Sequence, residues 1–249
     1  MPTLLVTGAA QRIGRAIALH FAKLGWDIIA HYNTSEEAAR TLKTEIETKG
    51  RKCCLIQADL ADESQVSRLM ESASAHAGFI EILVNNASTF QYDNHLTATR
   101  ESWDYHIEPN LRAPLVLSQH FERLMGKGLI INLIDERVWN LTPHYLSYTI
   151  SKYGLWGLTQ ALALSMAPSI RVNGIGPGPT LRNANQTESQ FANQCAATPL
   201  GRGGSTDEIV KAIELFWEMP SVTGQMIAID GGQHLGWKTP RNSDHRDGE

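Results

Sequence analysis

The sequence predicts an α/β fold in a single domain, with a parallel sheet covered by helices on both faces. Short apolar runs of strand length alternate along the chain with amphipathic stretches of helical spacing. The length of 249 residues suits one large core of this class. No internal repeat or low-complexity segment interrupts the alternation.

Seven apolar runs have the length and composition of buried strands. In chain order they are TLLVT (3–7), DIIAHY (27–32), CCLIQA (53–58), IEILVN (80–85), LIINLI (129–134), IRVNGI (170–175) and MIAID (226–230). Between most of them the apolar residues recur at helical spacing, as in Ile13, Ala16, Ile17, Phe21 and Leu24. The stretch 176–205 is rich in Gly, Pro, Asn, Gln and Thr, so we expect a substrate-binding loop there. Residues 238–249 form a polar tail that we expect to be frayed.

Composition excludes several classes of partner. The net charge of −4 and the pI near 6.1 give no electrostatic footprint for nucleic acid or an anionic membrane. The first residues lack the basic region of a signal peptide, and no apolar run approaches transmembrane length. The three cysteines fit neither a disulfide framework nor the spacing of a metal site. We therefore expect a soluble, cytoplasmic protein without a metal.

In open parallel sheets, ligands bind beyond the carboxyl ends of the strands. The stretch TGAAQRIG (7–14) follows the first strand and opens a helix. Gly8 permits a tight turn and Gly14 permits close packing of helix on strand, which leaves backbone N–H groups facing an anion. This position favours dinucleotide binding over a plain turn.

The end of the second strand predicts which dinucleotide binds. An acid that would hold a free ribose 2′-hydroxyl is missing there, and the chain has His31, Tyr32, Asn33, Thr34 and Ser35 instead. Arg12 stands inside the glycine turn, so a guanidinium and several hydroxyls favour a 2′-phosphate and NADP(H) over NAD(H). Thr34 followed by Glu37 also has the spacing of a capping box.

The stretch YTISK (148–152) begins a helical pattern and places Tyr148 and Lys152 four residues apart, on one helix face. An ammonium beside a phenol lowers a pKa that is normally near ~10, which would make Tyr148 a proton donor or acceptor near neutrality. His144 and Tyr145 lack such a partner in the sequence and are interpreted as wall or core residues. Asp135 ends an apolar strand, where a loop-capping role and a functional role are both open.

The motifs TGAAQRIG, NNAS (85–88), Asn110, YTISK and VNGIGPG (172–178), in this order, resemble the short-chain dehydrogenase/reductase family. The resemblance covers residues 1–237 and implies a Rossmann-type, doubly wound, seven-stranded sheet, usually in a homotetramer. It also implies hydride transfer between nicotinamide and substrate, with Tyr148 supplying the proton. Lys152 would hold the nicotinamide ribose, and Asn110 would join a proton relay through water.

Two departures from the common family pattern point to one branch of it. Arg12 replaces a middle glycine, and Asp135 replaces a serine that normally donates a hydrogen bond to a substrate carbonyl. An ionised carboxylate cannot donate, so a substrate rich in N–H groups with a reducible C=N bond suits Asp135 better. Both departures, with the motif HY..S (31–35), are similar to the pteridine reductase branch. That branch often has an arginine where this chain has Thr34, so more of the NADP preference rests on Arg12.

The resemblance assigns the site residues by role. The catalytic residues are Asp135, Tyr148, Lys152 and Asn110. The substrate residues are Arg12, Ser88, Phe90, Asp135 and Tyr148, with Phe90 stacking on the pterin. The cofactor residues are Gly8, Arg12, Ile13, Gly14, His31, Tyr32, Asn33, Thr34, Ser35, Asp59, Leu60, Asn85, Ala87, Ser88, Tyr148, Lys152, Pro177 and Gly178.

The predicted function is NADPH-dependent reduction of a dihydropterin. Two alternatives stay open: a general carbonyl reductase acting on 3-oxoacyl, sugar or xenobiotic ketones, and a catalytically silent dinucleotide sensor with the same fold. In the family, the segment matching GGQHLGW (231–237) can reach the site of a neighbouring subunit, which makes Trp237 a candidate for that contact or for an interface anchor.

Overall fold

The computed structural model describes residues 1–183 and 186–236. Its seven strands form one parallel sheet in the order β3-β2-β1-β4-β5-β6-β7. The strands are β1 (Thr3–Val6), β2 (Asp27–Tyr32), β3 (Cys53–Gln57), β4 (Ile82–Asn85), β5 (Gly128–Leu133), β6 (Ile170–Pro177) and β7 (Met226–Ile229). All seven predicted strands are confirmed, with ends that differ by at most two residues, and the doubly wound topology is confirmed with them.

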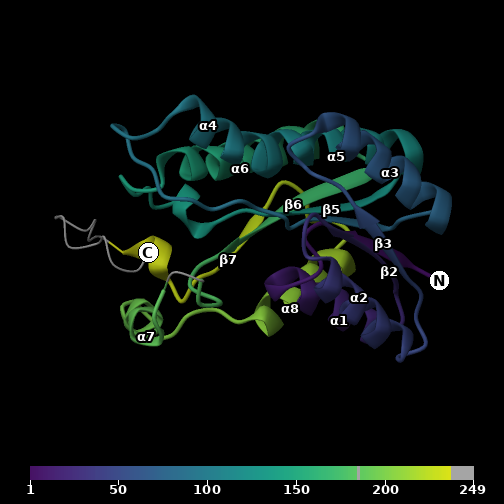
Figure 1. Cartoon of the computed structure of the whole chain (residues 1–249), viewed down its shortest axis with the longest axis horizontal. Coiled ribbons are helices and arrows are strands. Elements are labelled where there is room, and N and C mark those ends of the chain that lie inside the picture. The colour runs from purple at the N-terminus through teal and green to yellow at the C-terminus, as the bar shows by residue number, and fades with distance from the viewer. Residues whose placement is uncertain (184–185, 237–249) are drawn as a thin grey trace.

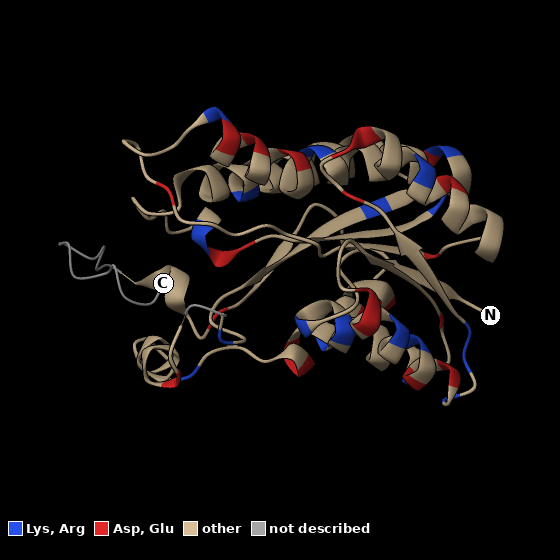
Figure 2. Cartoon of the chain, viewed as in Figure 1, with Lys and Arg blue, Asp and Glu red and all other residues tan. Residues whose placement is uncertain are grey.

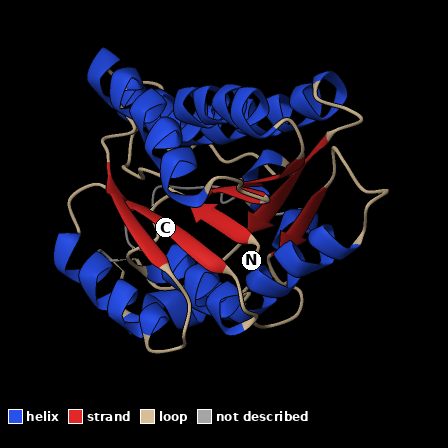
Figure 3. Cartoon of the chain, turned by 90° about the vertical axis from the view of Figure 1, so that its right-hand side faces the viewer, coloured by secondary structure: helices blue, strands red, loops and turns tan. Residues whose placement is uncertain are grey.

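Helices cover both faces of the sheet, as Figures 1 and 3 show. One face carries α3 (Glu63–Ala77), α4 (Arg100–Ile107), α5 (Ala113–Met125) and α6 (Leu146–Ser165). The other carries α1 (Arg12–Lys23), α2 (Glu36–Glu47) and α8 (Thr206–Glu218). Shorter segments are the π-helix η1 (Glu108–Arg112) and the 3-10 helices η2 (Glu136–Val138) and η3 (Gln233–Leu235).

The core is divided by the sheet into two layers. Leu4 and Val6 of β1 belong to the layer under α1 and α8, and Leu5 between them belongs to the layer under α3 and α5. This division follows from the alternation of side chains along a strand. Because both layers are apolar, the strands read as continuous hydrophobic runs, which is why they could be recognised in the sequence.

Helix α7 (Glu188–Ala196) lies in the stretch 176–205, where the sequence has no firm helix or strand pattern. Strand β6 also extends into the stretch as far as Pro177. A capping box between Thr187 and Gln190 starts α7, and none of its residues is buried. A helix without a buried face has no apolar periodicity, so the hydrophobic pattern gave no signal for it.

The predicted capping box between Thr34 and Glu37 was also wrong. Helix α2 has Ser35 as its N-cap, and no side chain caps it by a hydrogen bond. Trp237 and the tail 238–249 lie outside the described residues.

Charged residues of both signs are distributed over the helices on the two sides of the sheet, whereas the strands carry few of them (Figure 2). In the part of the chain that the structure describes, no helix combines the length and apolar character needed to cross a bilayer. The same residues contain no cluster of three or more His, Cys, Asp or Glu side chains that could hold a metal.

Candidate active site

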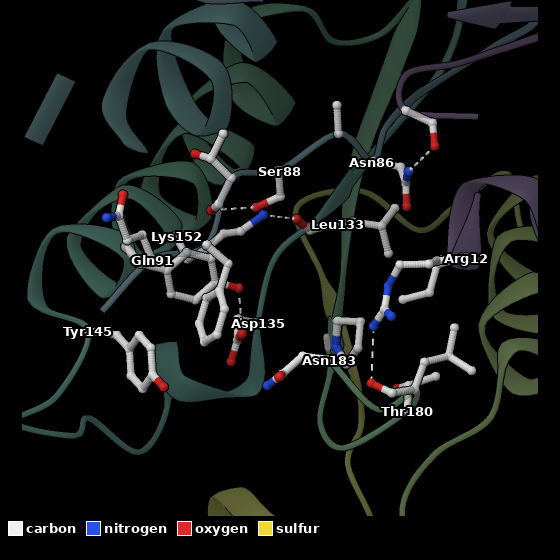
Figure 4. A pocket seen from close by; sticks show the side chains of 18 of the residues that line it. Arg12, Asn86, Ser88, Gln91, Leu133, Asp135, Tyr145, Lys152, Thr180 and Asn183 are labelled. Carbon is white, nitrogen blue, oxygen red and sulfur yellow. Dashed lines mark hydrogen bonds between the residues drawn. The ribbon is translucent and has the colours of Figure 1, made fainter. Parts of the chain in front are cut away.

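A cavity of about 1390 Å³ opens at the carboxyl ends of β1, β2, β4, β5 and β6. Most of the residues predicted for the site line it (Figure 4). These are Gly8, Arg12, Ile13, Gly14, Tyr32, Asn33, Thr34, Ser35, Ala87, Ser88, Phe90, Asp135, Tyr148, Lys152, Pro177 and Gly178. The cavity therefore joins the glycine turn to the Tyr148–Lys152 pair, which are far apart in the sequence.

The glycine turn after β1 has the geometry that its sequence predicts. Gly8 has a φ of +63°, in the left-handed region that favours glycine. A Cβ on Gly14 would lie 2.2 Å from the carbonyl oxygen of Gly8, so only glycine fits where α1 meets the turn. Helix α1 begins at Arg12 without a side-chain cap, so its first N–H groups remain available at the edge of the cavity. This arrangement fits the pyrophosphate of a dinucleotide.

Arg12 adopts a backbone conformation that favours glycine. Its φ is +52°, a conformation that costs a residue with a Cβ roughly 1–2 kcal/mol. Its guanidinium donates hydrogen bonds to the carbonyl oxygens of Leu181 and Arg182, at 3.0 and 2.8 Å. Arg12 thus bridges the glycine turn and the segment after β6 (Figure 4).

The end of β2 presents Tyr32, Asn33, Thr34 and Ser35 to the cavity, without an acid among them. The nearby carboxylate of Glu36 is paired with Arg40 at 2.6 Å, which offsets its repulsion of a phosphate. Neutral polar groups at this position fit a ribose that carries a 2′-phosphate.

His31, predicted as a cofactor contact, does not line the cavity. Its ring is buried outside the cavity, where Nδ1 accepts the N–H of Gly8 at 3.1 Å and Nε2 lies 3.0 Å from the carbonyl oxygen of Ala58. Burial lowers the pKa of His31 to about 4, so the ring is neutral at physiological pH. It supports the glycine turn and carries no charge toward a phosphate.

Three other predicted cofactor residues do not line the cavity. Asp59 accepts the N–H of Ala61 on its own loop, and Leu60 packs in the hydrophobic layer under α3 and α5. Asn85 is buried, and its amide donates to Asn132 at 2.8 Å. Asn85 therefore links β4 to β5 where the two strands pair.

The centre of the cavity contains a carboxylate bonded to a phenol. The Tyr148 hydroxyl donates to Oδ2 of Asp135 at 2.7 Å, and the backbone N–H of Arg137 donates to Oδ1 at 2.9 Å. Asp135 thereby caps the short helix η2 and touches Tyr148 at once. The loop-capping role that the sequence left open for Asp135 is present, and its functional role stays a prediction.

The predicted lowering of the Tyr148 pKa was wrong for the ligand-free protein. Burial and the neighbouring Asp135 carboxylate raise the pKa of Tyr148 well above 10. The Lys152 ammonium, which was expected to lower it, lies 5.8 Å from the centre of the Tyr148 ring and donates to the carbonyl oxygen of Leu133 at 2.8 Å. Burial lowers the pKa of Lys152 to about 8. Tyr148 accordingly holds its proton firmly.

Asn110 lies in η1 and does not line the cavity. Its Oδ1 accepts the N–H of Thr89 at 2.8 Å, and its Nδ2 donates to the carbonyl oxygen of Thr89 and to the hydroxyl of Ser151. These contacts hold the segment after β4 against α6. The water relay through Asn110 stays a prediction.

An aromatic wall, formed by Phe90, Tyr145 and Tyr148, faces Asp135. The rings of Phe90 and Tyr145 stack with centroids 4.5 Å apart, and Tyr148 meets Phe90 edge-on at 4.7 Å. The guanidinium of Arg137 lies 5.8 and 5.2 Å from the first two rings, and its Nε is 4.0 Å from Asp135. Sequence reasoning interpreted Tyr145 as a wall or core residue but missed Arg137, whose position two residues after Asp135 was the available signal.

Comparison with known proteins agrees with this geometry. A model of the family described as enoyl-(acyl carrier protein) reductase, a group of short-chain dehydrogenases, matches residues 8–234. The chain belongs to the short-chain dehydrogenase/reductase family. It is therefore an oxidoreductase of this family, and the fold and motif order that the resemblance implied are confirmed.

Relatives within the short-chain dehydrogenase/reductase family differ in substrate. The 3-oxoacyl-[acyl-carrier-protein] reductase of Staphylococcus aureus is 32% identical over 240 residues, which are 93% of this chain and 97% of that protein. The alternative dihydrofolate reductase FolM from Brucella suis, crystallised with NADP, is 42% identical, with a TM-score of 0.92 over 96% of this chain and 97% of its own. FolM from Brucella canis, also with NADP, is 41% identical, with a TM-score of 0.90 over 96% of both chains.

Proposed function

We propose that this short-chain oxidoreductase reduces a dihydropterin to its tetrahydro form with NADPH. The observation that carries the proposal is the Asp135 carboxylate, hydrogen-bonded to the Tyr148 hydroxyl at the end of β5. The similarity to the two FolM structures, each named as an alternative dihydrofolate reductase, supports it.

The preference for NADPH rests on the glycine turn and the end of β2. The first turn of α1 would hold the pyrophosphate, Arg12 would add a cation, and Asn33, Thr34 and Ser35 would receive the 2′-phosphate. When bound, NADPH supplies the hydride. Binding of NADPH should be at least tenfold tighter than that of NADH, and equal dissociation constants in a fluorescence titration would contradict this assignment.

Asp135 is the residue that selects the substrate. Its ionised carboxylate accepts hydrogen bonds and cannot donate one to a carbonyl oxygen. A pterin ring presents N–H and amino donors, which would compete with the Tyr148 hydroxyl for Oδ2 of Asp135. The freed hydroxyl could then turn toward the nitrogen of the reducible C=N bond.

Tyr148 supplies the proton in this scheme. The carbon of the C=N bond accepts the hydride, and the nitrogen accepts the proton as the Tyr148 O–H bond breaks. A phenol with a raised pKa keeps its proton until substrate replaces Asp135 as its partner. Lys152, buried beside Tyr148, would then stabilise the phenolate that forms.

Phe90 and the aromatic wall favour a flat ring as substrate. Phe90 is 40% exposed and lines the cavity, so one side of its ring is available for stacking. Ser88, also exposed on this segment, would contact the pterin or the cofactor, and Arg12 would reach both.

A carbonyl reductase is the second candidate, favoured by the 3-oxoacyl reductase among the relatives. The test is to mix the purified protein with NADPH and follow the loss of nicotinamide absorbance. Dihydrobiopterin, dihydromonapterin and dihydrofolate are offered beside an acetoacetyl ester. Oxidation that depends on a pterin, with no turnover of the ester, is expected. Turnover of the ester alone would overturn the pterin assignment, and turnover of neither class would favour a dinucleotide sensor.

A homotetramer in the cytoplasm is the setting we propose for this activity. The tetramer follows from the family resemblance, and light scattering on the purified protein would test it. The cysteines Cys53, Cys54 and Cys195 are all free, which fits a reducing compartment.

A further inference from the structure

A buried chain of polar side chains lies behind the aromatic wall. The carboxylate of Asp93 accepts the N–H of Ser147 at 3.0 Å and, through its other oxygen, the Ser147 hydroxyl at 2.5 Å. The Ser147 hydroxyl also lies 2.7 Å from Nδ1 of His106. Asp93, Ser147 and His106 are 2%, 0% and 0% exposed, and none of them lines the cavity.

This chain ties together the elements that carry the site. Gln91 and Asp93 follow Phe90 on the segment between β4 and α4, which we call the wall segment. Ser147 immediately precedes Tyr148, and His106 comes from α4. Helix α6 has no side-chain cap of its own, and Asp93 reaches its first turn from 54 residues away in the sequence. Its carboxylate therefore fixes the start of the helix that holds Tyr148 and Lys152.

The hydrogen bonds define the state of His106. Its Nε2 accepts the backbone N–H of Gln91 at 3.0 Å, so this nitrogen carries no proton. Nδ1 must then carry the proton, which it can donate to the carbonyl oxygen of Ser102 or to Ser147. The ring is thus a neutral acceptor for the wall segment.

Phe90 is held between two such contacts. The N–H of Thr89 is bonded to Asn110 and the N–H of Gln91 to His106, so the backbone on each side of Phe90 is fixed by a buried side chain. The edge of the His106 ring also meets Tyr148, with centroids 6.0 Å apart. Among the residues of α4, all of which the structure describes, His106 is the buried one. A histidine stands where an apolar side chain would suffice for packing alone.

We infer that His106, with Ser147 and Asp93, is a positioning residue that holds the aromatic wall and the start of α6 in register for the reaction. This inference goes beyond the proposed function and applies to whichever substrate the cavity accepts. His106 acts on Phe90 through the backbone of Gln91, and on Tyr148 through Ser147.

Two substitutions separate positioning from packing. His106→Phe keeps the ring volume and removes the acceptor, whereas His106→Gln keeps a neutral acceptor. We expect kcat/KM for the dihydropterin to fall roughly tenfold in His106→Phe, the size expected for one buried donor left unpaired. His106→Gln should stay within about threefold of the wild type. NADPH binding, measured by fluorescence, should change less than about twofold in both, because the glycine turn lies on the far side of the cavity.

The pH profile gives a second readout. Protonation of His106 would put an N–H on Nε2 against the N–H of Gln91, so the wild type should lose kcat/KM on the acid side, and His106→Gln should lose less. The groups that face His106 are Asp93, Tyr105 and Tyr148, and burial lowers the pKa of His106 below 6.5. His76→Phe, on the exposed face of α3, is the matched control and should behave as the wild type.

Equal kcat/KM in folded His106→Phe and the wild type would overturn the inference and leave His106 a packing residue. If His106→Phe does not fold, Ser147→Ala removes the hydroxyl that joins His106 to Asp93 and keeps the bond from Gln91 to His106. Its kcat/KM should fall about threefold with unchanged NADPH binding, and no fall would also overturn the inference. If the wild type reduces the acetoacetyl ester instead of a pterin, the proposed function fails, and the same variants are compared on the ester.

Discussion

The two sides of the cavity are lined by different chemical groups. The dinucleotide side, around β1 and β2, consists of backbone N–H groups, glycines and short neutral side chains, with Arg12 as its cation. The substrate side, around β5 and α6, brings Asp135, Tyr148 and Lys152 together, and the pKa values of Tyr148 and Lys152 are shifted in opposite directions. We expect the dinucleotide side to bind the phosphates of the cofactor and the substrate side to supply the proton. Changes on one side should therefore leave the other largely intact.

The largest expected effect is that of Tyr148→Phe. Removing the hydroxyl removes the proton donor, and kcat/KM should fall by roughly 10³, within the range for loss of a general acid. NADPH should still bind within about threefold of the wild-type affinity, because the pyrophosphate and 2′-phosphate contacts lie elsewhere. Stopped-flow turnover and a fluorescence titration on the same preparation measure both. A parallel loss of NADPH affinity would show that the two sides are not separable.

Lys152→Met should lower the activity of the protein and raise its stability at pH 7. Activity should fall by about 10², because the phenolate loses its cation. The pKa of Lys152 falls from 10.5 to about 8 on folding, so the native state releases a proton that the unfolded state keeps between these pH values. Wild-type stability from this group therefore rises with pH over that window, and at pH 7 the charged lysine is a cost.

Urea unfolding of the ligand-free proteins measures this effect. Lys152→Met should be more stable than the wild type by about 1–2 kcal/mol at pH 7, with a smaller difference at pH 9. The comparison of the two proteins removes contributions from other groups, such as Cys53, whose pKa is raised by burial. A less stable variant at pH 7 would mean that the bond from Lys152 to Leu133 outweighs the burial of the charge.

A pair of substitutions at Arg12 tests the dinucleotide side. Arg12→Gly and Arg12→Ala both lose the guanidinium, so both should bind NADPH roughly tenfold more weakly. Only glycine relieves the positive φ of +52°, and Arg12→Gly should melt about 2–4 °C higher than Arg12→Ala. Differential scanning calorimetry measures the difference. Equal melting temperatures would mean that the turn relaxes without strain.

The same contrast explains how much could be predicted from the sequence. The strands and the turn at Gly8 and Gly14 depend on local patterns, namely apolar runs and steric demands within a few residues, and they were predicted correctly. The protonation of Tyr148 depends on the depth of burial and on Asp135, 13 residues away, and its direction was predicted wrongly. The burial of His31 could not be predicted for a related reason, because its ring turns inward to accept the N–H of Gly8.

Contacts between segments far apart in the chain could not be predicted from the sequence. The bond from Asp93 to Ser147 spans 54 residues, and that from Arg12 to Leu181 spans 169. Neither pair carries a motif, because a buried carboxylate and a backbone carbonyl are recognised only once the chain is folded. Helix α7 lacked an apolar face and was missed for the opposite reason, since nothing in its pattern marks a packed helix.

The most direct test of the account is the substrate preference of Asp135→Ser. The serine restores a donor for a carbonyl oxygen and removes the acceptor for pterin N–H groups. The kcat/KM for the best dihydropterin should fall about 100-fold, while that for the acetoacetyl ester should stay level or rise. Dihydropterin reduction that survives within about twofold in this variant would contradict the central role of Asp135.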